Sequence, residues 1–331
     1  MKKIKFLAFI IVAVLMSAVV LTSCASGNLK DATELSGGDF VLKVDGEGVT
    51  YDTLRYYAGY YKYNLAGDDE TFWEDEKNVE DLTNLVNEAV AYTGAINSLC
   101  REYGLVFDEN DKIKVDNYVQ ALKDSFENEE DYLADLERNS LTEDVYRILV
   151  KNQLMNDKLS EYISNEGNGI VDSSDEAVIN LFKNDLCRAK HVLVMVEDES
   201  EREEKLELAN EIRDRALSGE DFDYLVGTYG DDTGMESYPD GYYFTYGEMV
   251  EEFEKAAFAL KADEVSEVVE TNFGYHIIKR YPIEESYLDD NFEDLRDKII
   301  VMEYNRLIEE KAKDVEVEYG KNFEKLDLTN L

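Results

Sequence analysis

The chain has 331 residues, of which 75 are acidic and 34 basic, so its formal net charge is −41. An acidic surface of this strength repels phosphate backbones, which excludes nucleic acid as a partner. With 44% hydrophobic residues the composition is that of a globular chain, and the length fits about two domains.

The N-terminus has the pattern of an export signal. Basic residues at positions 2, 3 and 5 precede an apolar run over residues 6–20. About 15 apolar residues are too few to span a membrane and are typical of a secretory signal. The run ends in LTSC, which resembles the lipobox of bacterial lipoproteins and implies cleavage after residue 23 with lipidation of Cys24. The alternative is an uncleaved anchor with an incidental cysteine.

A small, polar stretch over residues 24–38 predicts a flexible tether. The next residues predict two short strands around Asp45-Gly46, then a helix capped by Thr50. Helical patterns dominate residues 39–186, with expected helices near 81–103, 111–126 and 174–186 and a further one that Thr142 caps.

Strand-like and short helical runs alternate over residues 187–283, which predicts a compact α+β unit. A helical segment and tail follow over residues 284–331. Because one helix cannot bury its own apolar stripe, we expect this segment to pack on the N-terminal helices, so that the α+β unit is an insertion in a helical body.

Two cysteines remain beyond the signal, Cys100 and Cys187. A disulfide between them is arithmetically possible, but their surroundings favour buried free thiols. No Cys and His spacing indicates a metal, and no cofactor is expected.

The chain has only two histidines, and each lies in an apolar strand-like run: His191 in RAKHVLVMV and His276 in FGYHIIKR. Strand alternation places both imidazoles on packed faces. Because a buried imidazole without partners costs about 1–3 kcal/mol, each needs a hydrogen-bonding partner, and a network shared by both rings is the simplest solution.

Three runs in this region, RAKHVLV, GEDFDYLVGTYGDD and GEMVEEFEKAAFALKADEVSEVVETNFGYHIIKR, resemble the parvulin type of peptidyl-prolyl cis/trans isomerase in order and spacing. The whole layout resembles PrsA-type extracytoplasmic foldases of Gram-positive bacteria. The resemblance implies a parvulin domain, a small antiparallel sheet with surrounding short helices, inserted in a mainly helical SurA/PrsA-like chaperone body.

Carried onto this sequence, the resemblance makes His191 and His276 a central pair held face to edge, with Asp232 beside the reacting peptide. Those three residues are the expected catalytic set. The expected substrate-binding residues are Met249, Phe253, Phe244, Thr271 and Phe273. The alternatives are that the histidines only hold the sheet, that Asp232 is a turn residue, and that Met249 and Phe253 are ordinary helix-core residues.

Two aromatic segments leave questions open. Where many parvulins have a glycine-rich segment, this chain has YPDGYY, residues 238–243, which makes that edge of the pocket bulkier. No Arg and Lys cluster for phosphate recognition is evident. The tyrosine-rich run at residues 51–65 is either a peptide-binding groove or, as we favour, ordinary amphipathic packing.

The resemblance therefore predicts a lipid-anchored foldase at the extracytoplasmic face of the bacterial cell membrane. It would isomerise X-Pro bonds in unfolded or newly secreted proteins. The alternatives are a non-catalytic holdase, in which the parvulin unit is structural or only binds peptide, and a purely structural or solute-binding lipoprotein.

Overall fold

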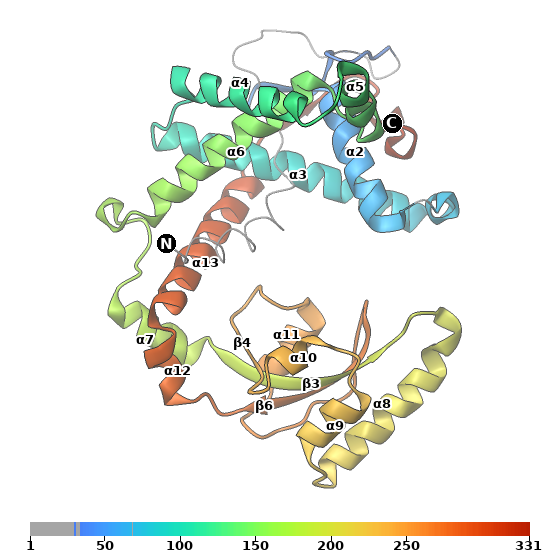
Figure 1. Cartoon of the computed structure of the whole chain (residues 1–331), viewed down its shortest axis with the longest axis vertical. Helices are drawn as coiled ribbons and strands as arrows, with labels where there is room; N and C mark the ends of the chain where they lie inside the picture. Colours follow the sequence, from blue (N-terminus) through green and yellow to red (C-terminus); the bar gives the residue numbers. More distant parts are fainter. Residues whose placement is uncertain (1–29, 31–33, 68) are drawn as a thin grey trace. The chain divides into compact units, whose positions relative to one another are not determined.

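A computed structural model describes residue 30 and residues 34–67 and 69–331 (Figure 1). The predicted signal and Cys24 lie outside the described residues. Across the described part of the chain, no helix combines the length and apolar character needed to cross a membrane. The chain folds into two compact units, one formed by residues up to Asn168 together with Glu303–Leu331, and the other by Gly169–Met302. We call these unit 1 and unit 2.

Unit 1 joins a helical body to a three-stranded antiparallel sheet of order β2-β1-β7. Its elements are β1 (Phe40–Val44), β2 (Glu47–Thr50), α2 (Tyr51–Ala66), α3 (Glu76–Glu102), α4 (Glu109–Asp124), α5 (Glu129–Arg138), α6 (Glu143–Ser164), the second half of α13 (Phe292–Lys313) and β7 (Val317–Tyr319). Short 3-10 turns cover Glu70–Glu74, Glu166–Asn168, Phe323–Lys325 and Leu328–Asn330.

The predicted hairpin and helix starts of unit 1 are confirmed. Asp45 and Gly46 both have positive φ, 47° and 80°, as the tight turn between β1 and β2 requires. The Thr50 side chain accepts a hydrogen bond from the Thr53 N–H and starts α2. Thr142 caps α6 in the same way through the Val145 N–H.

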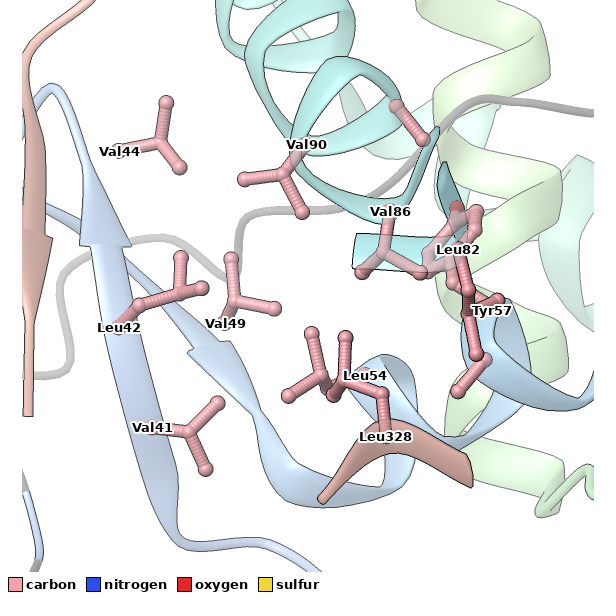
Figure 2. Close-up of a cluster of buried hydrophobic side chains, with 12 residues drawn as sticks. Val41, Leu42, Val44, Val49, Leu54, Tyr57, Leu82, Val86, Val90 and Leu328 are labelled. Atoms are coloured by element: carbon pink, nitrogen blue, oxygen red, sulfur yellow. The ribbon is translucent and has the colours of Figure 1, made fainter. Parts of the chain in front are cut away.

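The core of unit 1 lies between the β1–β2 hairpin and the helices α2 and α3 (Figure 2). Its buried members include Val41, Leu42, Val44, Val49, Leu54, Tyr57, Leu82, Val86, Val90 and Leu328. Tyr57 comes from the tyrosine-rich run, and its fully buried ring confirms amphipathic packing there, while Tyr63 at the end of the run is 71% exposed. Leu328 brings the last residues of the chain into the same core.

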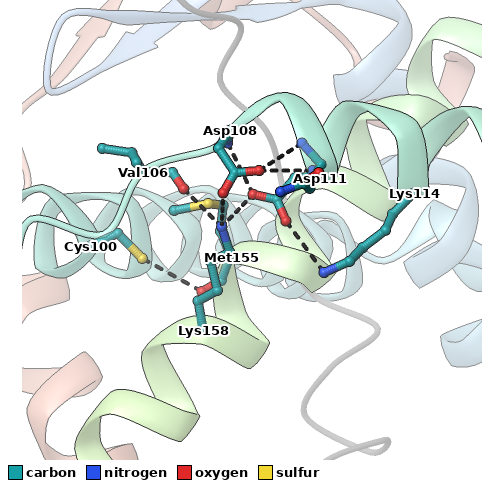
Figure 3. Close-up of polar contacts among 8 residues, drawn as sticks. Cys100, Val106, Asp108, Asp111, Lys114, Met155 and Lys158 are labelled. Carbon is teal, nitrogen blue, oxygen red and sulfur yellow. Dashed lines mark hydrogen bonds and ion pairs between the residues drawn. The ribbon is translucent and has the colours of Figure 1, made fainter.

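A buried ion pair fastens the loop between α3 and α4 (Figure 3). The Asp111 side chain is only 1% exposed, and Lys158 of α6 contacts its Oδ2 atom. Lys158 Nζ also donates to the Val106 carbonyl at 2.9 Å and lies 3.6 Å from Asp108 Oδ2. Burial raises the pKa of Asp111, but Lys158 and the Asp108 N–H outweigh it, so the net pKa is lowered. Lys158 therefore holds the loop and the start of α4 against α6.

Unit 2 is the α+β unit, with a four-stranded antiparallel sheet of order β4-β3-β6-β5. Its elements are α7 (Asp175–Asn184), β3 (Cys187–Met195), η3 (Glu199–Glu201), α8 (Arg202–Leu217), α9 (Phe222–Tyr229), α10 (Gly234–Ser237), β4 (Tyr242–Phe244), α11 (Glu251–Ala259), β5 (Val269–Thr271), β6 (Gly274–Tyr281), α12 (Glu285–Asp290) and the first half of α13. The expected α+β fold between helical segments is confirmed.

Helices cover both faces of this sheet (Figure 1). Val192, Val194 and Ile277 point to α8 and α9, whereas Ala189 and Ile278 point to α11. The run VSEVVE over residues 265–270 pairs as a regular strand only at its end, where β5 begins at Val269. Val265 forms only an isolated bridge to Lys279, because the Ser266 hydroxyl takes the Ile278 N–H that a longer ladder would use.

Candidate functional site

The two histidines meet on the α11 face of the sheet because of the register between β3 and β6. His191 lies opposite Ile278 and His276 opposite Leu193, so the two imidazoles are diagonal neighbours on one face. Their ring centroids are 5.1 Å apart, and their Nδ1 atoms are 3.0 Å apart. The predicted shared network is therefore present.

The expected face-to-edge arrangement of the rings is wrong. The ring planes lie at only 19° to each other. The physical reason is the hydrogen bond between the Nδ1 atoms. The N–H of one imidazole and the lone pair of the other both lie in the ring planes, so the two rings meet through their edges and neither presents its face to the other. The ring that does stand edge-on to both histidines is Phe253 of α11, at 5.1 Å and 81° from His191 and 5.5 Å and 76° from His276.

Asp232 completes the network from the loop after α9. Its Oδ2 atom lies 2.7 Å from His191 Nε2 and accepts a hydrogen bond from the Tyr242 hydroxyl at 2.9 Å. Its Oδ1 atom accepts from the Gly234 N–H at 2.8 Å. The preceding Asp231 ties the loop to β3, because its N–H donates to the Leu193 carbonyl and its carboxylate accepts from the Met195 N–H.

The direction of the network follows from the charge of Asp232. The hydrogen bond from His191, aided by the Gly234 N–H and the Tyr242 hydroxyl, lowers the pKa of Asp232 to about 2, so the carboxylate only accepts at neutral pH. With both rings neutral, His191 donates through Nε2, and its Nδ1 atom accepts from His276 Nδ1–H. Burial, with His191 beside it, lowers the pKa of His276 to about 4, which keeps that ring neutral.

Thr271 terminates the network at the end of β5. Its Oγ1 atom lies 2.8 Å from His276 Nε2, to which it donates when that ring is neutral, and it accepts the Phe273 N–H at 3.1 Å. The Phe273 side chain itself is 49% exposed on the β5–β6 turn. Thr271 is therefore the last member of the hydrogen-bond network, and Phe273 lies on the exposed turn beside it.

The apolar side of the site comes from α11 and the residues before it. Phe253 packs in one cluster with Met249 and Phe244, which places all three expected pocket residues together. Phe244 is only 1% exposed, and its ring lies 5.9 Å from that of Phe253 and 5.8 Å from that of Phe258. Phe244 therefore supports Phe253 from below the surface.

Sequence reasoning treated YPDGYY only as a bulky edge and missed the role of Tyr242. Alternation along β4 was the available signal, because residues 242 and 244 must share a face. In the structure Tyr242 contacts Asp232, and its ring lies 6.1 Å from His191 and 5.1 Å from Tyr238.

Two thiols lie outside this site in the described part of the chain. Cys100 and Cys187 are both buried and free, and burial raises the pKa of each to about 11. Within the described ranges, no three His, Cys, Asp or Glu side chains are grouped so that they could hold a metal ion.

Comparison with known proteins places the same region in a known family. Residues 191–281 match the PPIC-type PPIASE domain of the Rotamase family. A foldase protein PrsA of Halalkalibacterium halodurans is 36% identical over 159 residues, which are 47% of this chain and 44% of that protein. One of Caldanaerobacter subterraneus subsp. tengcongensis is 29% identical over 317 residues, covering 89% of this chain and 92% of that one.

The crystal structure of a peptidylprolyl isomerase (PrsA) from Bacillus anthracis is 23% identical to this chain, covering 70% of it and 96% of the other chain, with a TM-score of 0.37.

Proposed function

This chain belongs to the parvulin-type, PrsA-like foldases, and on that premise we propose that unit 2 catalyses cis/trans isomerisation of X-Pro bonds in exported proteins. One observation supports this proposal above the others. The network that runs from Asp232 through His191 and His276 to Thr271 lies directly beside the apolar ring of Phe253. A charged group and an apolar wall side by side suit a substrate with an amide and a proline ring.

The reaction needs neither a nucleophile nor a metal. Rotation about an amide bond has a barrier of about 18–20 kcal/mol, because resonance is lost in the twisted state. Uncatalysed X-Pro bonds therefore exchange over tens of seconds or longer. An enzyme accelerates the exchange by binding the twisted amide better than the planar one.

The residues of the site divide this task. Phe253 and Met249 would hold the proline ring by apolar contact. Asp232 would lie beside the amide carbonyl, and its negative charge destabilises the planar form, in which resonance puts partial negative charge on the oxygen. The twisted form carries less of that charge, so the carboxylate favours it.

The histidine pair supports this field and does not move a proton. All four ring nitrogens already have partners: Asp232 at one end, Thr271 at the other and each other in the middle. A ring nitrogen engaged in this way is not available to protonate an amide nitrogen. We therefore assign the pair to holding Asp232 and the floor of the site in place.

The decisive experiment is a proline-isomerisation assay with short X-Pro peptides. We expect Asp232→Ala to lower kcat/KM at least tenfold relative to wild type, because the charge beside the carbonyl is lost. Asp214→Ala is the matched control, since that aspartate is exposed on α8, and it should keep full activity. Equal rates for wild type, Asp232→Ala and buffer would refute catalysis.

The same experiment separates the enzyme from a holdase. The paired rings of Tyr238 and Tyr242, 5.1 Å apart, make the edge of the site bulky, which favours the holdase as the second candidate. A wild-type protein without turnover that still suppresses aggregation of an unfolded client would establish the holdase. Turnover above buffer would exclude it.

The membrane location and the nature of the clients are part of the proposal. The lipobox-like LTSC sequence supports a lipid anchor at Cys24, with the body on the extracytoplasmic side. We expect Cys24→Ser to release the protein from the membrane fraction, whereas Cys100→Ser should not. Unchanged retention of Cys24→Ser would contradict the anchor.

A further inference from the structure

We propose that Tyr242 is a positioning residue, whose hydroxyl fixes the Asp232 carboxylate in the orientation that the site requires. The inference rests on the proposed function, because it assigns a role within that same site. It starts from the hydrogen bond that the Tyr242 hydroxyl donates to Asp232 Oδ2 at 2.9 Å, on the oxygen that also binds His191 Nε2.

The register of β4 brings this hydroxyl to the site. Tyr242 lies opposite Ala189 and Tyr243 opposite Arg188, so the two tyrosines point to opposite faces of the sheet. His191 follows Ala189 by two residues and points to the same face of the sheet, so Tyr242 shares that face with His191. Tyr243 instead stacks on Tyr287, with ring centroids 3.7 Å apart and planes at 4°.

The segment before Tyr242 is fixed to the sheet from both sides. Buried Arg188 donates to the Asp240 carbonyl at 2.6 Å and to the Pro282 carbonyl at 3.1 Å. Gly241 has a φ of +94°, and a Cβ atom there would lie 2.8 Å from the Ala189 carbonyl oxygen. Only glycine fits so close to β3 with that backbone conformation. The Tyr242 ring therefore projects from a backbone segment that is held in one conformation.

The Tyr242 hydroxyl is also closely surrounded by Gly234 and Asp232. A Cβ atom at Gly234 would lie 2.0 Å from the Tyr242 oxygen and 2.9 Å from Asp232 Oδ1. Burial and then the neighbouring Asp232 charge raise the pKa of Tyr242, so the phenol keeps its proton and donates. Three donors, from Tyr242, His191 and Gly234, thus surround one carboxylate and fix both of its oxygens.

The test compares Tyr242→Phe with Tyr243→Phe, which removes a hydroxyl from the same strand but on the other face. Loss of one hydrogen bond to the carboxylate should raise the pKa of Asp232 by about 0.5–1 pH unit in Tyr242→Phe only. NMR titration of the labelled Asp232 carboxyl group measures this shift without any need for turnover. An unchanged Asp232 titration in Tyr242→Phe overturns the inference.

The isomerase assay gives the functional readout of the same pair. In Tyr242→Phe we expect kcat/KM at neutral pH to fall about three- to tenfold, which corresponds to one hydrogen bond. Equal kcat/KM values for wild type and Tyr242→Phe, with wild type active, would overturn the inference and leave the proposed function intact.

A steric variant tests the same contact from the other side. Gly234→Ala should displace the Tyr242 hydroxyl and reproduce the shift in the Asp232 titration. Combined with Tyr242→Phe, it should cause a smaller further change than it causes alone, because the Tyr242 oxygen is gone and the closest remaining contact is the one at 2.9 Å with Asp232 Oδ1. Additive shifts in the double variant would contradict the confinement. If wild type lacks turnover but these titrations behave as expected, the positioning role stands and the isomerase function fails.

Discussion

One carboxylate in each unit, Asp111 in unit 1 and Asp232 in unit 2, is surrounded by hydrogen-bonding or charged partners, and the two environments differ. In unit 1, Asp111 is fully enclosed and meets the permanent charge of Lys158. In unit 2, the Asp232 side chain remains 24% exposed and meets one imidazole, a hydroxyl and a backbone N–H. The first arrangement closes a loop, whereas the second keeps an oxygen-rich surface within reach of solvent. Burial and the kind of partner separate a carboxylate enclosed in the fold from one that solvent can reach.

The largest expected effect comes from breaking the enclosed pair. Lys158→Met leaves the buried Asp111 carboxylate with only the exposed Lys114 ammonium, 3.5 Å from its Oδ1 atom, so the free energy of unfolding of unit 1 should fall by about 3 kcal/mol. Urea unfolding measures the loss. Lys112→Met is the control, because its pair with Glu109 is exposed and should be worth less than about 0.5 kcal/mol. A similar small loss for both variants would show that Asp111 is not locked by Lys158.

Acid should loosen unit 2 through His276. The pKa of this ring falls from 6.5 to about 4 on folding, so the unfolded chain binds the proton first as the pH drops. Its contribution is fully present above pH 6.5 and is lost as the pH falls through 4, by about 3 kcal/mol in total.

Because the chain has only two histidines, NMR can follow both imidazoles directly, and unfolding curves at several pH values give the stability. Titration of His276 near 6.5 would contradict the buried, neutral ring. His276→Gln should flatten the pH dependence between pH 6.5 and 4.

Phe253 and Phe258 both lie in α11, and comparing them tests whether the apolar wall of the site is Phe253 alone or the whole helix. Either one changed to leucine should cost about 1 kcal/mol of stability, because a large apolar group remains. Only Phe253 stands edge-on to both histidines, whereas Phe258 stacks on Tyr246. We expect Phe253→Leu to lower kcat/KM about tenfold and Phe258→Leu to leave it unchanged. Equal activity losses would assign the wall to the whole helix.

The smallest expected effect concerns the end of the network. Thr271→Val removes the hydroxyl that faces His276 Nε2 and should cost about 1 kcal/mol of stability. Thr271→Ser keeps the hydroxyl and should restore most of that loss in a thermal unfolding assay. No rescue by serine would mean that the methyl group of Thr271, and not its hydroxyl, carries the effect.

The sequence predicted those parts of the fold and the site that depend on local patterns. Alternation placed His191 and His276 on packed faces, and the polar pair at Asp45-Gly46 predicted the hairpin turn. These signals are local because strand alternation and turn chemistry act over a few residues. Asp232 came instead from the resemblance to parvulins, which implied a place beside the reacting peptide.

The features that sequence reasoning missed depend on contacts distant along the chain. The ring orientation of the histidine pair follows from the bond between their Nδ1 atoms, which no spacing reveals. Lys158 meets Asp111 only because α6 packs on α4, and residues 108 and 111 read from sequence merely as a helix start. The Tyr242 hydroxyl finds Asp232 through the pairing of β4 with β3.

The path of the chain through unit 1 has a consequence for the order in which the units fold during synthesis. β1 pairs with β7, and Leu328 enters the core that the first hairpin begins, so unit 1 cannot close until nearly the whole chain has emerged. Unit 2 is one continuous stretch, Gly169–Met302, and can fold while the tail is still being delivered. Unit 2 can therefore fold before unit 1, and β1, which pairs early with β2, receives its second neighbour β7 last.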